Sequence, residues 1–148
     1  MALDQQTQVQ LPAKQNKTQY KSLSRIMIID DDKELLEELK DFLSTRYEVE
    51  TLFDSSHAFE KGSASKPDLI IMDMKMFPKT GFQLAYEFKN DAGTKFIPII
   101  GITGVFIERE HNLMMKLSGI KRIILKPFTF DQLLKEIDTA LEGSRGHE

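Results

Sequence analysis

Two short apolar runs that end in aspartate constrain the fold more than any other feature of this sequence. Residues 25–30 read Arg-Ile-Met-Ile-Ile-Asp, and residues 68–73 read Asp-Leu-Ile-Ile-Met-Asp. Continuous apolar runs of this length are typical of strands whose two faces are both buried. Such strands form parallel sheets covered by helices on both sides, so the runs indicate an α/β fold.

The remaining segments alternate between the strand and helix patterns. After the first run, leucine and phenylalanine residues recur at the spacing of one helix face, at positions 35, 36, 39, 42 and 43. Five strands and five helices in alternation predict a doubly wound parallel sheet with helices on both faces. The further strands are expected at 47–52, 96–102 and 120–125, and the further helices at 54–63, from Gly81 to a stop at Gly93, at 105–117, and at 130–141 after a capping box of Thr129 and Gln132.

A chain of 148 residues is long enough for one compact domain. Residues 1–24 are rich in Gln, Lys and Thr without a sustained period, so we expect a flexible N-terminal extension there. We expect the domain to occupy residues 25–142, and residues 143–148 to form a frayed C-terminal tail.

The composition excludes several classes of protein. Hydrophobic residues make up 41% and charged residues 29%, as in ordinary soluble proteins. No run approaches the roughly 20 apolar residues of a membrane span, and the N-terminus resembles no signal or transit peptide, so we predict a cytoplasmic protein without membrane insertion. Cysteine is absent, so any metal must be bound by oxygen or imidazole. The net charge is −3 and no basic face is evident, which argues against direct nucleic-acid binding.

Reactive side chains follow the predicted strands at the point where each strand ends. Residues 30–32 are three aspartates after the first strand, Asp73 ends the third, Thr103 follows the fourth and Lys126 follows the fifth. In a doubly wound sheet, ligands bind outside the carboxyl ends of the strands. We therefore expect these side chains to lie together at one edge of the sheet.

The expected cluster suits a phosphoryl group and a metal ion. Converging carboxylates raise one another's pKa unless a cation compensates them, and hard oxygen ligands favour Mg²⁺ or Mn²⁺. With a metal on one side and the Lys126 ammonium on the other, Asp73 is suited to be the nucleophile that accepts a phosphoryl group. Thr103 could then donate its hydroxyl to a phosphoryl oxygen.

From about Arg25 to Leu141 the chain resembles the CheY-like response-regulator receiver domains of two-component signalling. The resemblance implies a flavodoxin-like sheet with strand order 2-1-3-4-5. It also matches residues to roles: the acidic pair to Asp30 and Asp31, the phospho-acceptor to Asp73, the switch hydroxyl to Thr103 and the invariant lysine to Lys126. By the same resemblance, Asp31, Asp73 and the main-chain carbonyl of Lys75 bind the metal directly, and Asp30 assists through water.

Three positions depart from the pattern of that family. The family usually has proline four residues after the acceptor, whereas Phe77 is there in this chain and Pro78 follows. The switch position, commonly aromatic, is Ile123, which cannot present a hydroxyl to a partner. Gly104 follows Thr103 and leaves the expected phosphoryl pocket open to water, which should affect the lifetime of the acyl phosphate.

The resemblance also implies partners and a reaction. A sensor histidine kinase or a histidine phosphotransfer protein would supply the phosphoryl group. The domain would catalyse its own phosphorylation and slow autodephosphorylation, without being a conventional enzyme. An output protein would bind the face made by the fourth helix, the fifth strand and the fifth helix, and a homodimer is a further option.

Two alternatives stand beside this interpretation. A haloacid-dehalogenase-like phosphatase would use Asp30 as its nucleophile, but no acidic pair follows Lys126 and the chain lacks length for a cap. A metal-independent pseudo-receiver would act only as a binding module, and the intact acidic set disfavours it. We interpret Asp32 as an early residue of the first helix rather than as a metal ligand.

Overall fold

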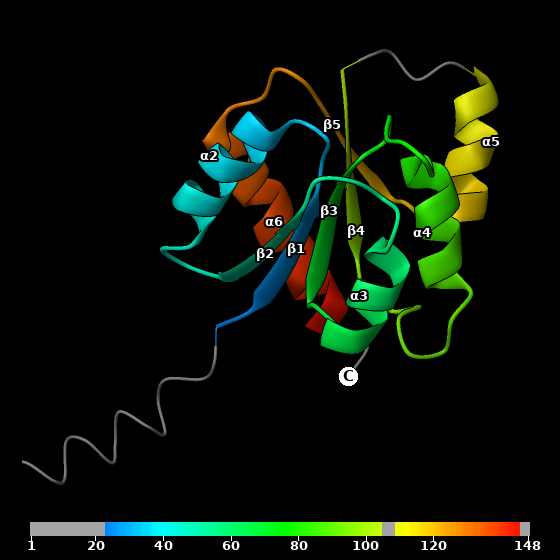
Figure 1. Ribbon diagram of the computed structural model, residues 1–148, viewed down its shortest axis with the longest axis horizontal. Coiled ribbons are helices and arrows are strands. Elements are labelled where there is room, and N and C mark those ends of the chain that lie inside the picture. Colours follow the sequence, from blue (N-terminus) through cyan, green and yellow to red (C-terminus); the bar gives the residue numbers. More distant parts are fainter. Residues whose placement is uncertain (1–22, 105–108, 146–148) are drawn as a thin grey trace, which may run out of the picture.

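The computed structural model describes residues 23–104 and 109–145, which form one parallel sheet between two layers of helices (Figure 1). The sheet has five strands in the order β2-β1-β3-β4-β5, so the predicted α/β fold and strand order are confirmed. The strands are β1 (Arg25–Ile29), β2 (Glu48–Leu52), β3 (Leu69–Asp73), β4 (Ile99–Thr103) and β5 (Arg122–Leu125). The helices are α2 (Lys33–Leu43), α3 (Ala58–Ser65), α4 (Gly81–Lys89), α5 (Arg109–Ser118) and α6 (Phe130–Arg145).

The helices cover both faces of the sheet because the strand side chains alternate between two apolar cores. Helices α2 and α6 lie over one face, where they pack on Ile26, Ile28 and other strand residues (Figure 1). Helices α3 and α4 lie over the opposite face, which includes Met27 and Ile29, and α5 lies beside α4. Strand β3 is buried on both faces along its whole length, as its apolar sequence predicts.

Side chains at the helix starts explain where several helices begin. The carboxylate of Asp32 accepts a hydrogen bond from the Leu35 N–H at 3.1 Å, so Asp32 caps α2, in keeping with our interpretation of this residue. The predicted capping box of Thr129 and Gln132 is confirmed by two reciprocal bonds of 2.9 and 3.1 Å. A second capping box, Thr80 with Gln83, begins α4 and was not predicted.

Helices α3 and α4 differ most clearly from the predicted boundaries. Helix α3 begins at Ala58 rather than at Asp54, because the Asp54 carboxylate accepts a bond from the Ser56 N–H and holds a turn. Helix α4 ends at Lys89 with Asn90 as its cap, so the prediction of a stop at Gly93 is wrong. Strands β2 and β3 begin one residue later than predicted, and β4 and β5 begin later still, at Ile99 and at Arg122.

The C-terminal helix is longer than the sequence predicts. Helix α6 continues to Arg145 and so includes residues 143–145, which we expected to be frayed. Most of the predicted N-terminal extension, the first residues of the predicted helix at 105–117, and residues 146–148 lie outside the described residues. Within residues 23–104 and 109–145, no helix combines the length and apolar content needed to cross a membrane.

Candidate functional site

Three aspartates meet at the carboxyl edge of the sheet. Asp30 directly follows β1, Asp73 is the last residue of β3, and Asp31 stands next to Asp30. One carboxylate oxygen from each of them lies within 4.8 Å of the others. Because β1 and β3 are parallel neighbours in register, their ends bring Asp30 and Asp73 side by side. The proximity predicted from the sequence is therefore observed.

Main-chain amides orient the two buried carboxylates of this group. Oδ1 of Asp30 accepts a hydrogen bond from the Asp32 N–H at 2.9 Å. Oδ1 of Asp73 accepts one from the Lys75 N–H at 3.1 Å. Asp30 and Asp73 are buried, whereas Asp31 is exposed. In each buried carboxylate, Oδ1 accepts the hydrogen bond from the main-chain N–H, and Oδ2 faces the ammonium of Lys126.

Lys126 brings a positive charge to the same edge from the end of β5. Its ammonium nitrogen lies 3.2 Å from Oδ2 of Asp30 and 3.9 Å from Oδ2 of Asp73. The Lys126 N–H donates a 2.7 Å bond to the Thr103 carbonyl, which ties the end of β5 to the end of β4. Four of the five strands thus supply a reactive group to one edge, as the sequence predicts.

Burial controls the ionisation of the two inner carboxylates. It raises the pKa of Asp30 above its ordinary value, while the Asp32 amide and the Lys126 ammonium oppose the shift. Burial also raises the pKa of Asp73, opposed by the Lys75 amide, and the neighbouring Asp30 charge raises it further. One ammonium therefore compensates only part of the negative charge gathered at this edge.

The donor set at this edge fits a hard divalent cation. The carboxylates of Asp30, Asp31 and Asp73 can each supply an oxygen ligand. Oxygen donors with several negative charges are the ligands that Mg²⁺ and Mn²⁺ prefer. Burial raises the pKa values of Asp30 and Asp73, and a doubly positive ion would stabilise the charged form of both carboxylates.

Thr103 and Gly104 lie beside the carboxylates at the end of β4. Thr103 is buried, and it lies opposite Leu125 of β5 in the sheet. Gly104 is exposed, and among the described residues no atom lies within 4 Å of the place that a Cβ would occupy there. The described residues therefore leave the space beside Gly104 unfilled.

Phe77 and Ile123, the two other departures from the family pattern, lie in different surroundings. Phe77 is 82% exposed and is joined to Pro78 by a cis peptide bond in the loop after β3. Ile123 packs on Gly101 of β4: a Cβ added at Gly101 would lie 2.8 Å from Cδ1 of Ile123 and 2.6 Å from the sulfur of Met74. Ile123 therefore shares its space with the residue that follows Asp73.

Ser55 contacts the loop that follows Asp73, which the sequence does not predict. Ser55 is buried between α3 and the loop after β3, and its hydroxyl bonds to both main-chain groups of Lys79. In the sequence Ser55 falls within a stretch that we predicted as helix, and a lone serine there carries no signal. Only the spatial approach of two loops reveals it.

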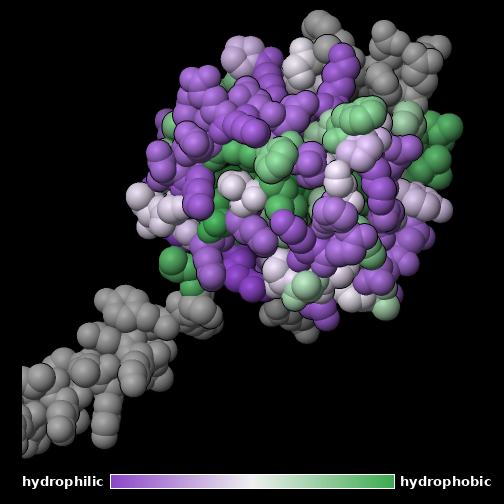
Figure 2. Space-filling model, viewed as in Figure 1, coloured by the Kyte–Doolittle hydropathy of each residue, from purple (hydrophilic) through white to green (hydrophobic). Residues whose placement is uncertain are grey.

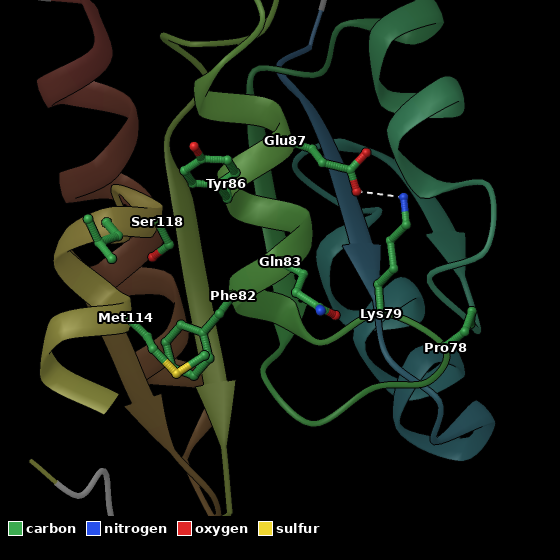
Figure 3. Close-up of a pocket in the computed structure, with 9 residues that line it drawn as sticks. Pro78, Lys79, Phe82, Gln83, Tyr86, Glu87, Met114 and Ser118 are labelled. Atoms are coloured by element: carbon green, nitrogen blue, oxygen red, sulfur yellow. Dashed lines mark hydrogen bonds and ion pairs between the residues drawn. The ribbon is translucent and has the colours of Figure 1, made fainter. Parts of the chain in front are cut away.

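A groove of about 470 Å³ lies away from the carboxylates, between α4 and α5 (Figure 3). Phe82, Tyr86 and Met114 line it, and Lys79 pairs with Glu87 at its rim. Hydrophobic side chains also gather on the outer surface where α5 lies (Figure 2), where Leu113 and Leu117 are exposed. Met114 is also exposed on this surface.

Comparison with known proteins agrees with this geometry. The chain is 32% identical to the transcriptional regulatory protein RprY of Bacteroides fragilis over 123 residues, which cover 82% of this chain and 51% of RprY. It is 29% identical to protein PilH of Pseudomonas aeruginosa over 82% of this chain and 100% of PilH. The crystal structure of a CheY-like receiver domain protein from Methanospirillum hungatei matches with a TM-score of 0.79 at 26% identity, covering 86% of this chain and 100% of that one.

The chain spans about half of RprY and 7% of the hybrid signal transduction histidine kinase D of Dictyostelium discoideum, so these relatives contain much that this chain does not match. The model of the response regulator receiver domain matches residues 26–138, a segment that contains the acidic site and all five strands except Arg25, the first residue of β1. That match excludes the haloacid-dehalogenase-like alternative. The chain belongs to the response regulator receiver domain family of two-component signalling.

Proposed function

We propose that this domain accepts a phosphoryl group on Asp73. The observation that carries the proposal is the cluster of three carboxylates within 4.8 Å of one another, with the Lys126 ammonium 3.9 Å from Asp73. The phosphorus–nitrogen bond of a phosphohistidine donor breaks as a bond forms from phosphorus to Oδ of Asp73. The imidazole leaves with the electron pair, and the product is an acyl phosphate.

Asp31, Asp73 and the main-chain carbonyl of Lys75 would hold a Mg²⁺ or Mn²⁺ ion, with Asp30 acting through water. The ion would supply positive charge to the oxygens of the transferring group. Asp30 is buried, and the hydrogen bond that its carboxylate accepts from the Asp32 N–H fixes its orientation, which suits a residue that positions water. Asp31 is exposed, which suits a direct ligand.

The remaining residues of the site would act on the phosphoryl group itself. The Lys126 ammonium would donate a hydrogen bond to one phosphoryl oxygen, and the Thr103 hydroxyl would donate one to another. Gly104 would leave the group accessible to water and so allow slow autodephosphorylation. Ile123 would respond to phosphorylation by packing, since it shares its space over Gly101 with Met74.

The phosphoryl donor would be a sensor histidine kinase or a histidine phosphotransfer protein. The output face would be formed by α5, β5 and α6. Exposed apolar side chains on that face, including Leu113, Leu117 and Leu125, support a protein partner there or a second copy of the chain. Size-exclusion chromatography with and without beryllofluoride would test dimerisation, and identical elution volumes would reject it.

The phosphorylation site is tested by intact mass measurement after incubation with acetyl phosphate and Mg²⁺. We expect the wild type to gain one phosphoryl group and Asp73→Asn to gain none. Asp41→Asn, which changes an exposed aspartate on α2, is the matched control and should be modified like the wild type. An undiminished adduct in Asp73→Asn would reject the acceptor. No adduct and no Mg²⁺ binding in the wild type would instead favour the pseudo-receiver.

A further inference from the structure

Ser55 joins two loops that are distant in the sequence. Its hydroxyl donates a 2.9 Å hydrogen bond to the Lys79 carbonyl and accepts a 2.8 Å bond from the Lys79 N–H. Ser55 is 1% exposed, so the hydroxyl side of both bonds is buried in the domain. A single side chain thus holds both main-chain groups of a residue 24 positions away.

The loop held in this way is the one that follows Asp73. At its start, the Met74 N–H continues the sheet by bonding to the Ile102 carbonyl at 2.9 Å. At its end, the Gly81 N–H bonds to the Met74 carbonyl at 3.1 Å and closes the loop. Met76 is buried beneath it. These contacts belong to the loop and to β4, whereas the Ser55 bonds attach its far side to a different part of the domain.

Lys79 is held from a second direction by its side chain. Its ammonium pairs with the Glu87 carboxylate of α4 at 2.6 Å, and Figure 3 shows the side chain extending toward Glu87. Lys79 is therefore fixed to α4 through its side chain and to the loop before α3 through its main chain. The Lys79–Glu87 pair is partly exposed, so on its own it fixes the loop only weakly.

We infer that Ser55 is a positioning residue for the metal site. By fixing the far side of the loop, it holds the Lys75 carbonyl and the Lys75 N–H that orients Asp73 in the arrangement that binds the cation. The inference rests on the proposed function, in which Lys75 is a metal ligand. Groups behind the direct ligands typically change metal affinity about 10- to 100-fold when removed. Ser55 contacts Lys79 rather than a metal ligand, so we expect its removal to weaken the Mg²⁺ affinity by only about 5- to 10-fold.

The test is the Mg²⁺ dependence of phosphorylation by acetyl phosphate in wild type and Ser55→Ala. We expect the Mg²⁺ concentration for half-maximal rate to rise about 5- to 10-fold, with the rate at saturating Mg²⁺ close to that of the wild type. Calorimetric titration with Mg²⁺ should show the same loss of affinity. A merely structural role would lower the amount of folded protein without shifting this concentration.

Ser56→Ala is the matched control, because Ser56 is the exposed neighbour and its side chain makes no hydrogen bond within the described residues. Ser55→Thr keeps the hydroxyl and should restore most of the affinity. If Ser55→Ala does not fold, Ser55→Cys fills the same space with a weaker hydrogen-bonding group and should give an intermediate shift. Unchanged Mg²⁺ dependence in folded Ser55 variants would overturn the inference, whereas a wild type that binds no Mg²⁺ would overturn the proposed function itself.

Discussion

The ammonium nitrogen of Lys126 lies 3.2 Å from Oδ2 of Asp30, a carboxylate whose side chain is only 2% exposed. The same nitrogen is 3.9 Å from Oδ2 of Asp73, so it stands closer to the first carboxylate than to the proposed acceptor. Lys126 therefore has two potential tasks. It compensates the charge of Asp30, and it is within reach of a group bound to Asp73.

These two tasks can be separated with Lys126→Met, which removes the charge and keeps an apolar side chain of similar length. We expect the phosphorylation rate with acetyl phosphate to fall about 100-fold, the scale of losing one preorganised donor. Mg²⁺ affinity should rise, because no ammonium competes with the cation for Asp30. Rates are measured at saturating Mg²⁺ and affinity by calorimetry. Lys121→Met, at an exposed lysine before β5, should change neither quantity. A rate equal to wild type would contradict the role of Lys126.

The raised pKa values of Asp30 and Asp73 predict how stability depends on pH in the presence of a chelator. The folded chain binds protons at these carboxyls more tightly than the unfolded chain, whose value is near 3.8. The free energy of unfolding should therefore decrease as pH rises from about 3.8 through the raised values, because the folded state then loses its extra protons. Urea unfolding at a series of pH values measures this slope.

Removing the charge of Asp73 should raise the free energy of unfolding at neutral pH. We expect Asp73→Asn to unfold at a higher urea concentration than wild type in the chelator, because the neutral side chain avoids the cost of burying a charge and also the repulsion with Asp30. Added Mg²⁺ should stabilise the wild type and leave Asp73→Asn nearly unaffected. A variant less stable than wild type in the chelator would show that the neutral side chain is not tolerated and that burial of charge is not the dominant cost.

Most of the candidate site could be predicted from the sequence because parallel strands end at one edge. Asp30 and Asp73 each follow an apolar run, and Lys126 follows another, so the fold alone brings them together. The hydrogen-bond partners of Asp30 and Asp73 could not be predicted in the same way. They are amides two residues further along the chain, and their contacts depend on turns that no hydrophobic period encodes.

The end of α4 and the contact of Ser55 could not be predicted, because both depend on hydrogen bonds made by polar side chains. Gly93 was a reasonable helix stop, but the Asn90 amide side chain donates a 2.8 Å bond to the Tyr86 carbonyl and ends α4 earlier. Thr94 adds a 2.7 Å bond from its hydroxyl to the Phe88 carbonyl. The Ser55 contact with Lys79 joins residues whose separation along the chain hides their proximity, so it required the folded structure.

Gly81 allows α4 to begin directly against the main chain of the acceptor. A Cβ at this position would lie 2.7 Å from the Asp73 carbonyl oxygen and 2.8 Å from Cα of Met74, and neither can move without the backbone. We expect Gly81→Ala to lower the free energy of unfolding by about 1–3 kcal/mol and to slow phosphorylation. Gly143→Ala, where α6 leaves open space among the described residues, should instead stabilise the fold by about 0.5–1 kcal/mol. Equal unfolding midpoints for the two variants in urea would contradict this expectation.

Gly101 offers a test of the contact between the acceptor strand and β5. A methyl group there would collide with the sulfur of Met74 and with Cδ1 of Ile123, both side-chain atoms that can shift. We expect Gly101→Ala to cost about 1–3 kcal/mol in urea unfolding, because both side chains must leave their packed positions. Gly104→Ala, three residues along, meets no described atom within 4 Å and should leave stability within about 0.5 kcal/mol of wild type. Wild-type stability in Gly101→Ala would show that Met74 and Ile123 repack freely, and Ile123 could then not report the state of Asp73.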